Sequence, residues 1–191
     1  MTSLMEGNEM NENVQSVKSA LSERSRMTKE EFIQTLSERN WVEFGKGRIS
    51  SPDSVISEAI VKDLSKILPA SAEIYYAIEL SHLGESLTGN LVWLLLLRNQ
   101  LLQITATMVK AGPKKDELLQ ITHRFYPKER LDRAEIQVHH TEGSGESGRI
   151  ELPYSASAVL VFMGGERIEI PRRVGPSGVE ALREFMGSLS P

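Results

Sequence analysis

The stretch ILPASAEIYYAIEL, residues 67–80, contains the change of hydrophobic period that decides the fold. Upstream of Pro69, the apolar residues Ile56, Ile60 and Leu64 recur at the spacing of one helix face. Downstream of Pro69 the period becomes two, which is typical of a strand whose inward face carries Ile74, Tyr76, Ile78 and Leu80. The sequence therefore predicts helices before Pro69 and strands after it.

Six more strands are expected along the chain, near residues 91–97, 102–108, 119–125, 134–138, 158–163 and 168–170. Alternation predicts the inward side chains of the fourth and fifth strands, which are Leu119, Ile121, His123 and Phe125, then Ala134, Ile136 and Val138. Ser177 and Glu180 have the spacing of a capping box that starts one final amphipathic helix. We expect this helix to dock on the sheet, because a short isolated helix is unstable in water.

The region before the strands contains two helix-start signals. Thr28 and Glu31 have the spacing of a capping box, which predicts a short helix that ends near Arg39. Ser51 followed by Pro52 predicts a second helix, because proline is well tolerated at the first helical position. We therefore expect two helices packed on the sheet.

Composition sets the domain organisation and excludes several chemistries. The chain has 191 residues, no cysteine and a formal net charge of -4, so thiol chemistry is excluded and nucleic acid is not an expected partner. Residues 1–27 hold few large apolar groups and are expected to be disordered. The remainder divides into a helical region, 28–68, and a β domain, 69–191. Because the start lacks a signal-peptide pattern and no apolar run could span a bilayer as a helix, we expect a cytoplasmic protein, with export by a route that uses no cleaved apolar signal as the alternative.

The apolar run Leu91–Leu97 does not alternate, so both faces of its strand are expected to be covered. One face belongs to the interior of the sheet. The other is covered either by the helices of residues 28–68, which we favour, or by another subunit. On the second alternative, the apolar contact consists of Trp93, Leu95 and Leu97.

The order of seven strands and one final helix resembles the pleckstrin-homology superfold. The matching features run from Ile67-Leu68-Pro69 through Glu73, Gly89 and Leu91-Val92 to Leu101-Leu102-Gln103-Ile104, as in the opening of bacterial PH-like domains. The resemblance covers roughly residues 60–190. It implies an α+β fold: a seven-stranded antiparallel, partly open PH-like barrel capped by a C-terminal helix and used as a non-catalytic binding scaffold. The lipid-binding members use basic residues in the first strand loop, whereas residues 81–90 contain no Lys or Arg, which argues against phosphoinositide binding.

A basic stretch between residues 110 and 133 is the candidate anionic-ligand patch. Its seven cationic residues are Lys110, Lys114, Lys115, Arg124, Lys128, Arg130 and Arg133. Four acidic residues are interspersed, so we favour a charge-mixed rim, with an anionic-lipid or membrane-surface patch as the alternative. Arg167, Arg172 and Arg173 would extend the patch if the fold brings them close.

Catalytic and cofactor motifs are not found in the sequence. There is no HExxH helix, nucleophile elbow, P-loop or dinucleotide fingerprint, so we assign no catalytic, cofactor-binding or metal-ligating residue. Gly45-Lys46-Gly47-Arg48 is typical of a solvated turn, with a phosphate-holding loop as the alternative. His123 is expected to be partly buried with its hydrogen bonds satisfied. We predict a non-enzymatic protein-interaction module that binds a protein partner or itself; the alternatives are a lipid-surface binder and an enzyme with an unrecognised site.

Overall fold

The structure is a computed structural model that describes residues 26–81, 90–111, 116–139 and 155–189. Within these residues the chain forms three α-helices, one short 3-10 helix and ten strands, and the strands belong to three separate sheets. The predicted single seven-stranded barrel is therefore wrong. Alternation along a strand predicts its two faces but not its neighbours, so the sequence pattern did not reveal where one sheet ends and the next begins.

The largest sheet has five strands in the order β1-β4-β5-β6-β7. Their bounds are β1 Met27–Thr28, β4 Glu73–Ser81, β5 Asn90–Leu97, β6 Gln100–Ala111 and β7 Asp116–Pro127. All pairs in this sheet are antiparallel. The 3-10 helix η1, Lys128–Arg130, follows β7 and leads the chain into a second sheet.

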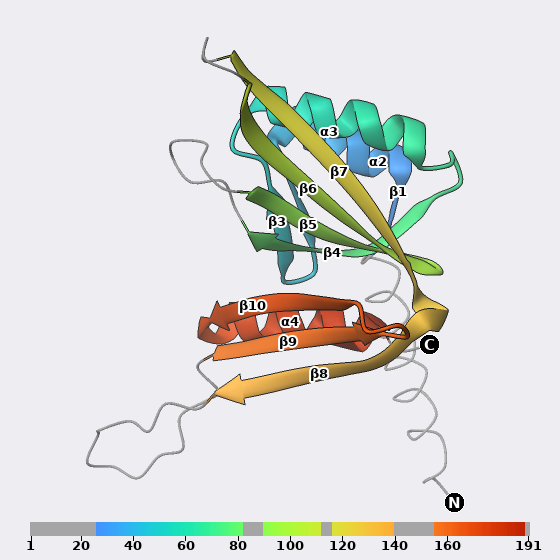
Figure 1. Cartoon of the computed structure of the whole chain (residues 1–191), viewed down its shortest axis with the longest axis vertical. Coiled ribbons are helices and arrows are strands. Elements are labelled where there is room, and N and C mark those ends of the chain that lie inside the picture. The colour runs from blue at the N-terminus through green and yellow to red at the C-terminus, as the bar shows by residue number, and fades with distance from the viewer. Residues whose placement is uncertain (1–25, 82–89, 112–115, 140–154, 190–191) are drawn as a thin grey trace, which may run out of the picture.

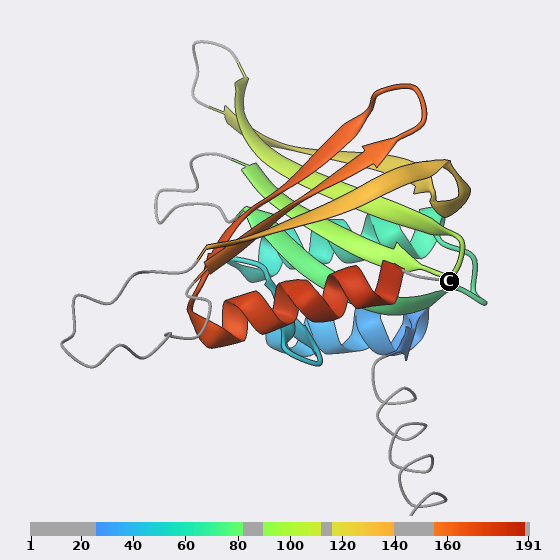
Figure 2. The same ribbon diagram turned by 90° about the horizontal axis from the view of Figure 1, so that it is seen from below.

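The second sheet has three antiparallel strands in the order β10-β9-β8. These are β8 Leu131–His139, β9 Ser155–Phe162 and β10 Arg167–Val174. It lies below the five-stranded sheet in Figure 1 and crosses that sheet when the molecule is seen from below in Figure 2. A separate hairpin of β2 Trp41–Phe44 and β3 Gly47–Ser50 forms the third sheet.

Both helices expected before Pro69 are present. Helix α2, Lys29–Arg39, has the expected capping box, in which the Glu31 N–H donates to the Thr28 hydroxyl at 3.2 Å and the Thr28 N–H donates to the Glu31 carboxylate at 2.8 Å. Helix α3, Ser54–Ile67, is capped by Asp53 rather than started at Ser51-Pro52, because the Asp53 carboxylate accepts the Ile56 N–H at 2.8 Å.

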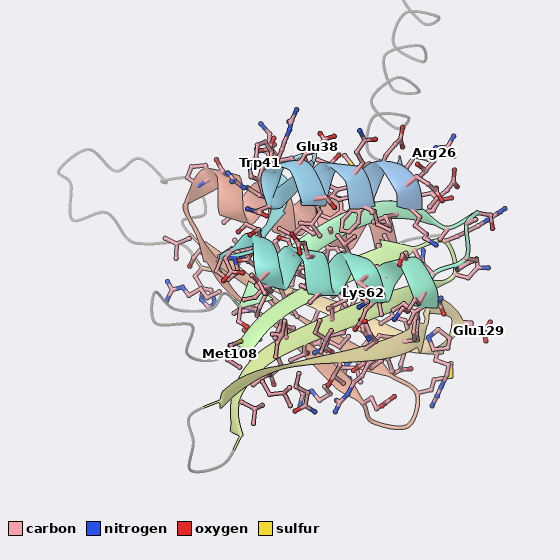
Figure 3. The ribbon with its side chains drawn as sticks, turned by 90° about the horizontal axis from the view of Figure 1, so that it is seen from above. Arg26, Glu38, Trp41, Lys62, Met108 and Glu129 are labelled. Atoms are coloured by element: carbon pink, nitrogen blue, oxygen red, sulfur yellow. The ribbon has the colours of Figure 1, made fainter. Side chains whose placement is uncertain are left out.

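The outer face of β5 is covered by the protein's own helices. Leu91, Trp93 and Leu95 are fully buried in the same hydrophobic cluster as Ile60 and Leu64 of α3. Figure 3 shows α2 and α3 lying across the upper face of the five-stranded sheet, with Lys62 on α3. The favoured prediction of cover from within the chain is confirmed.

The last helix, α4, spans Gly175–Leu189 and docks on the sheets, as expected. It begins before Ser177, so the predicted capping box does not mark its start. It packs against β9 and β10 on one side and β3 and β4 on the other. A row of aromatic rings, Phe32, Phe44, Tyr76 and Phe185, connects α2 to α4 through the core, with neighbouring centroids 5.9 to 6.3 Å apart.

Three predicted inward side chains, Phe125, Ala134 and Ile136, lie on the surface instead. Phe125 is 40% exposed and Ile136 is 39% exposed, because β7 and β8 are edge strands of their sheets. Tyr126 is buried in place of its neighbour and packs on Phe162 of β9, with ring centroids 4.9 Å apart. This contact joins the two sheets beside η1.

Candidate binding cleft

A cleft of about 420 Å³ lies between the five-stranded sheet and strand β10. Its floor is the sheet face opposite α2 and α3 and consists of Leu80, Ser81, Val92, Gln103, Arg124 and Tyr126. Its wall is one stretch of β10, made of Arg167, Ile168, Glu169 and Pro171. A concave site with a few convergent polar groups is the best candidate for ligand binding in a protein of unassigned function.

The wall presents backbone as well as side chains. Phe162 N–H donates to the Glu166 carbonyl at 2.9 Å, so these two residues form a hydrogen-bonded pair at the β9–β10 hairpin. Hydrogen-bonded and non-hydrogen-bonded pairs alternate along an antiparallel ladder. Arg167 and Glu169, which face Val161 and Val159, therefore direct their N–H and C=O groups away from β9.

That free edge faces the cleft. Because β10 is the end strand of its sheet, no described strand pairs with the outward groups of Arg167 and Glu169. The Ile168 side chain is buried in the core, so Ile168 lines the cleft mainly through its backbone. Pro171 continues the wall, and a residue without an N–H is tolerated at an edge that needs no partner.

The floor presents hydrogen-bond donors. Gln103 and Arg124 are direct cross-strand partners on β6 and β7. The Tyr126 hydroxyl donates to Gln103 Oε1 at 3.1 Å, which fixes the orientation of the amide. With its oxygen occupied, the Gln103 side chain retains its two N–H donors for a ligand.

The charges of the cleft favour an anion. Arg124 and Arg167 are exposed, and within the described ranges neither forms an ion pair or a side-chain hydrogen bond. Glu169 supplies one opposing carboxylate on the wall. Two guanidinium groups against one carboxylate leave the cleft positive in a chain whose net charge is -4.

The side chains with shifted pKa values lie outside the cleft. Burial and the Glu184 carboxylate raise the pKa of Tyr76, whose hydroxyl contacts α4. Burial lowers the pKa of His123, although Asp63 opposes the shift, and burial lowers the pKa of Arg173. None of these groups lines the cleft.

The described members of the basic stretch have different surroundings. Arg124 lines the cleft, whereas Arg130 donates to the Met163 carbonyl at 2.8 Å and Arg133 pairs with Glu135 at 2.8 Å. Lys128 is half-buried in η1. Lys114, Lys115 and the Lys110 side chain lie outside the described residues. Of the proposed extension, Arg167 joins Arg124 at the cleft.

The other candidate residues have structural roles. Trp93, Leu95 and Leu97 are at most 6% exposed, so they are core residues rather than an exposed contact. Of the predicted turn Gly45-Lys46-Gly47-Arg48, only Gly45 and Lys46 connect β2 to β3, because Gly47 and Arg48 belong to β3. The Lys46 N–H donates to Glu184 at 2.8 Å, which leaves that amide unavailable to a phosphate.

His123 differs from its prediction in one respect. It is partly buried as expected, but its Nε2 atom has no hydrogen-bond partner in the described structure. His139 lies exposed at the end of β8, and His82 and His140 are outside the described residues. In the described ranges, no group of three metal-ligating side chains is close enough to hold a metal ion. No described helix combines the length and apolar character needed to cross a membrane.

Comparisons with known proteins add little to this geometry. No family model matches the chain, and no curated protein matches it. A solved structure similar to the chain is the hSac2 domain from the human phosphoinositide phosphatase Sac2, with 15% identity and a TM-score of 0.39, covering 74% of this chain and 82% of that one. A likeness at this level carries no conclusion about function. The resemblance to bacterial PH-like domains stays a prediction.

Sequence reasoning found Arg124 but missed the cleft that contains it. Gln103 and Arg124 were visible as polar positions in alternating strands, yet only the register places them side by side. The free edge of β10 had a weak signal in Pro171, since proline within a strand indicates an edge. The juxtaposition of β10 with the five-stranded sheet depends on long-range packing and had no local signal.

Proposed function

We propose that the protein is a non-catalytic interaction module that binds an extended segment of a partner protein along the free edge of β10. The observation that carries the proposal is the pair of outward N–H and C=O groups at Arg167 and Glu169, which border the cleft. An extended peptide supplies the complementary backbone groups and adds a fourth strand to the three-stranded sheet. The floor of the cleft then contacts the peptide side chains.

Strand β8 is the competing edge, because it closes the other side of the same sheet. We favour β10 because a cleft with polar donors adjoins its edge. A bound segment would therefore make side-chain contacts in the cleft as well as backbone hydrogen bonds to β10. A cytoplasmic location stays a prediction.

The test is a selection of peptide binders from a random displayed library against the intact chain. Binders are then measured against E169P, which removes one outward N–H, and against E169A, which removes the same carboxylate but keeps the amide. We expect E169P to abolish binding that E169A retains. A134P, at an exposed position of β8 whose amide points away from β9, should leave binding intact.

Two results would contradict the proposal. Binders that are lost with A134P and kept with E169P would place the edge at β8. A selection that yields no binder sensitive to E169P would contradict the proposal that β10 pairs with a partner segment. Circular dichroism of each variant checks that the fold is retained, so that a loss of binding is not a loss of structure.

A further inference from the structure

We infer that the partner segment is acidic, with carboxylate side chains that alternate along an extended chain. This inference rests on the proposed function, because it assigns the chemistry of the segment that pairs with β10. The cleft arginines Arg124 and Arg167 supply the positive charge that an acidic segment complements. An acidic preference goes beyond edge pairing, which by itself selects no side chain.

The two arginines lie on different walls. Arg124 projects from the floor, whereas Arg167 belongs to the β10 wall and shares a strand face with Glu169. Successive side chains of a strand point to opposite faces. A strand added beside β10 therefore directs one set of side chains to Arg124 and the other set toward the Arg167 side.

The donors at each position suit carboxylates. A guanidinium group binds a carboxylate through two parallel N–H donors, and the adjacent Gln103 amide supplies further donors on the floor. Because neither arginine has an acidic partner in the described structure, an acidic segment breaks no described ion pair when it binds. A basic segment would meet two like charges and a single carboxylate, Glu169.

Glu169 limits how acidic the segment can be at one point. Its carboxylate stands between the positions of Arg167 and Pro171 on the wall and repels a second negative charge placed there. Removal of this charge in E169A is therefore expected to strengthen the binding of an acidic peptide. The same variant leaves the edge amide in place.

The experiment is isothermal titration calorimetry of the intact chain with three synthetic peptides of equal length. In these peptides threonine alternates with glutamate, glutamine or lysine. We expect the glutamate peptide to bind most tightly and to weaken as salt is added. R124Q and R167Q should each weaken it by about two- to five-fold, as for exposed charge pairs, and the matched control R183Q, on the exposed side of α4, should not.

The outcomes separate the inference from the proposed function. Equal binding of the glutamine peptide, with sensitivity to E169P, would overturn the acidic assignment and leave edge pairing in place. Failure of all three peptides, together with a failed library selection, would overturn both. Heat from inorganic phosphate that depends on Arg124 and Arg167, without peptide binding, would identify a free-anion site and also overturn the acidic-peptide assignment.

Discussion

Tyr76 links β4 to α4 through its hydroxyl group. The oxygen lies 3.0 Å from the Ala181 carbonyl and 3.1 Å from Glu184, and the same Glu184 carboxylate accepts the Lys46 N–H of the β2–β3 turn. Since burial and Glu184 both raise the pKa of Tyr76, the phenol stays neutral and donates. The hydroxyl therefore fixes the position of the helix against the strand.

The variant Y76F tests this role. It should lower the free energy of unfolding by about 1–3 kcal/mol, because a buried hydrogen bond to a charged group is lost without change of ring volume. Urea denaturation measures the difference. The control Y75F removes a hydroxyl that donates to Glu73 at 2.9 Å nearer the surface and should cost less. Equal losses for the two variants would contradict a special role for Tyr76.

His123 makes stability depend on pH. Burial lowers its pKa below the usual 6.5, so the folded state favours the neutral ring. Stability is therefore complete above pH 6.5 and declines as the pH falls below that value, because the unfolded chain takes up the proton first. Asp63 on α3 moderates the effect through its charge.

The variant H123F removes both the titration and the unpartnered Nε2 atom. We expect its unfolding free energy to fall less than that of the wild type between pH 7 and pH 5, in matched urea titrations. At pH 7 the variant should be at least as stable, since no hydrogen bond is lost. An identical pH slope in the two proteins would show that other groups govern the acid response.

At the scale of elements, the helix caps separate what the sequence predicted from what it did not. Local signals placed α2 correctly, because its capping box lies within four consecutive residues. The start of α3 was predicted wrongly, because three polar residues, Ser51, Asp53 and Ser54, could each cap the helix. Pro52 favoured Ser51 as the cap, since proline is common at the first helical position. The structure assigns the cap to Asp53.

The cap assignment makes a stability prediction. D53A should lower the free energy of unfolding by about 1 kcal/mol, because it exposes the first-turn N–H groups of α3. S51A should cost less, since the Ser51 hydroxyl donates to the Asp53 carbonyl instead of accepting a helix N–H. Thermal unfolding of both variants compares them. A larger loss of unfolding free energy for S51A than for D53A would show that Ser51 caps α3, as the sequence predicted.

The strands show where alternation succeeds and fails. Strand β5 lies within the sheet, and its unbroken apolar run correctly predicted cover on both faces. Strands β7 and β8 are edges, so Phe125 and Ile136 follow the apolar alternation of their strands and yet stay exposed. The short strands β2 and β3 were read as a turn with flanks, because four residues give too few alternations to count.

At the scale of the whole molecule, α2 and α3 are part of the core that the sheet requires. Without residues 1–68, a face that includes Leu91, Trp93, Leu95 and Ile104 would meet water. We expect the fragment 69–191 to be insoluble or self-associated, because an apolar face of this kind is not tolerated on a monomer. Light scattering of the fragment beside the intact chain measures this. A monomeric, well-folded fragment would contradict the account.

The arrangement of the sheets could not be obtained from the sequence. Each strand signal was local, whereas the contact of Tyr126 with Phe162 and the docking of α4 against β4 and β9 join residues far apart in the chain. The cleft exists only through those contacts. Each hydrogen-bond donor of the cleft could therefore be identified in the sequence, but their proximity to one another could not be predicted.

Amide hydrogen exchange followed by NMR tests the central claim most directly. Spectra of the intact chain are compared with and without the peptide in which glutamate alternates with threonine. Exchange should slow at the backbone N–H groups of Arg167 and Glu169 and stay unchanged at Ala134 and Ile136 on the β8 edge. Binding that protects the β8 amides, or that leaves Arg167 and Glu169 exchanging as in the free protein, would contradict strand addition at β10.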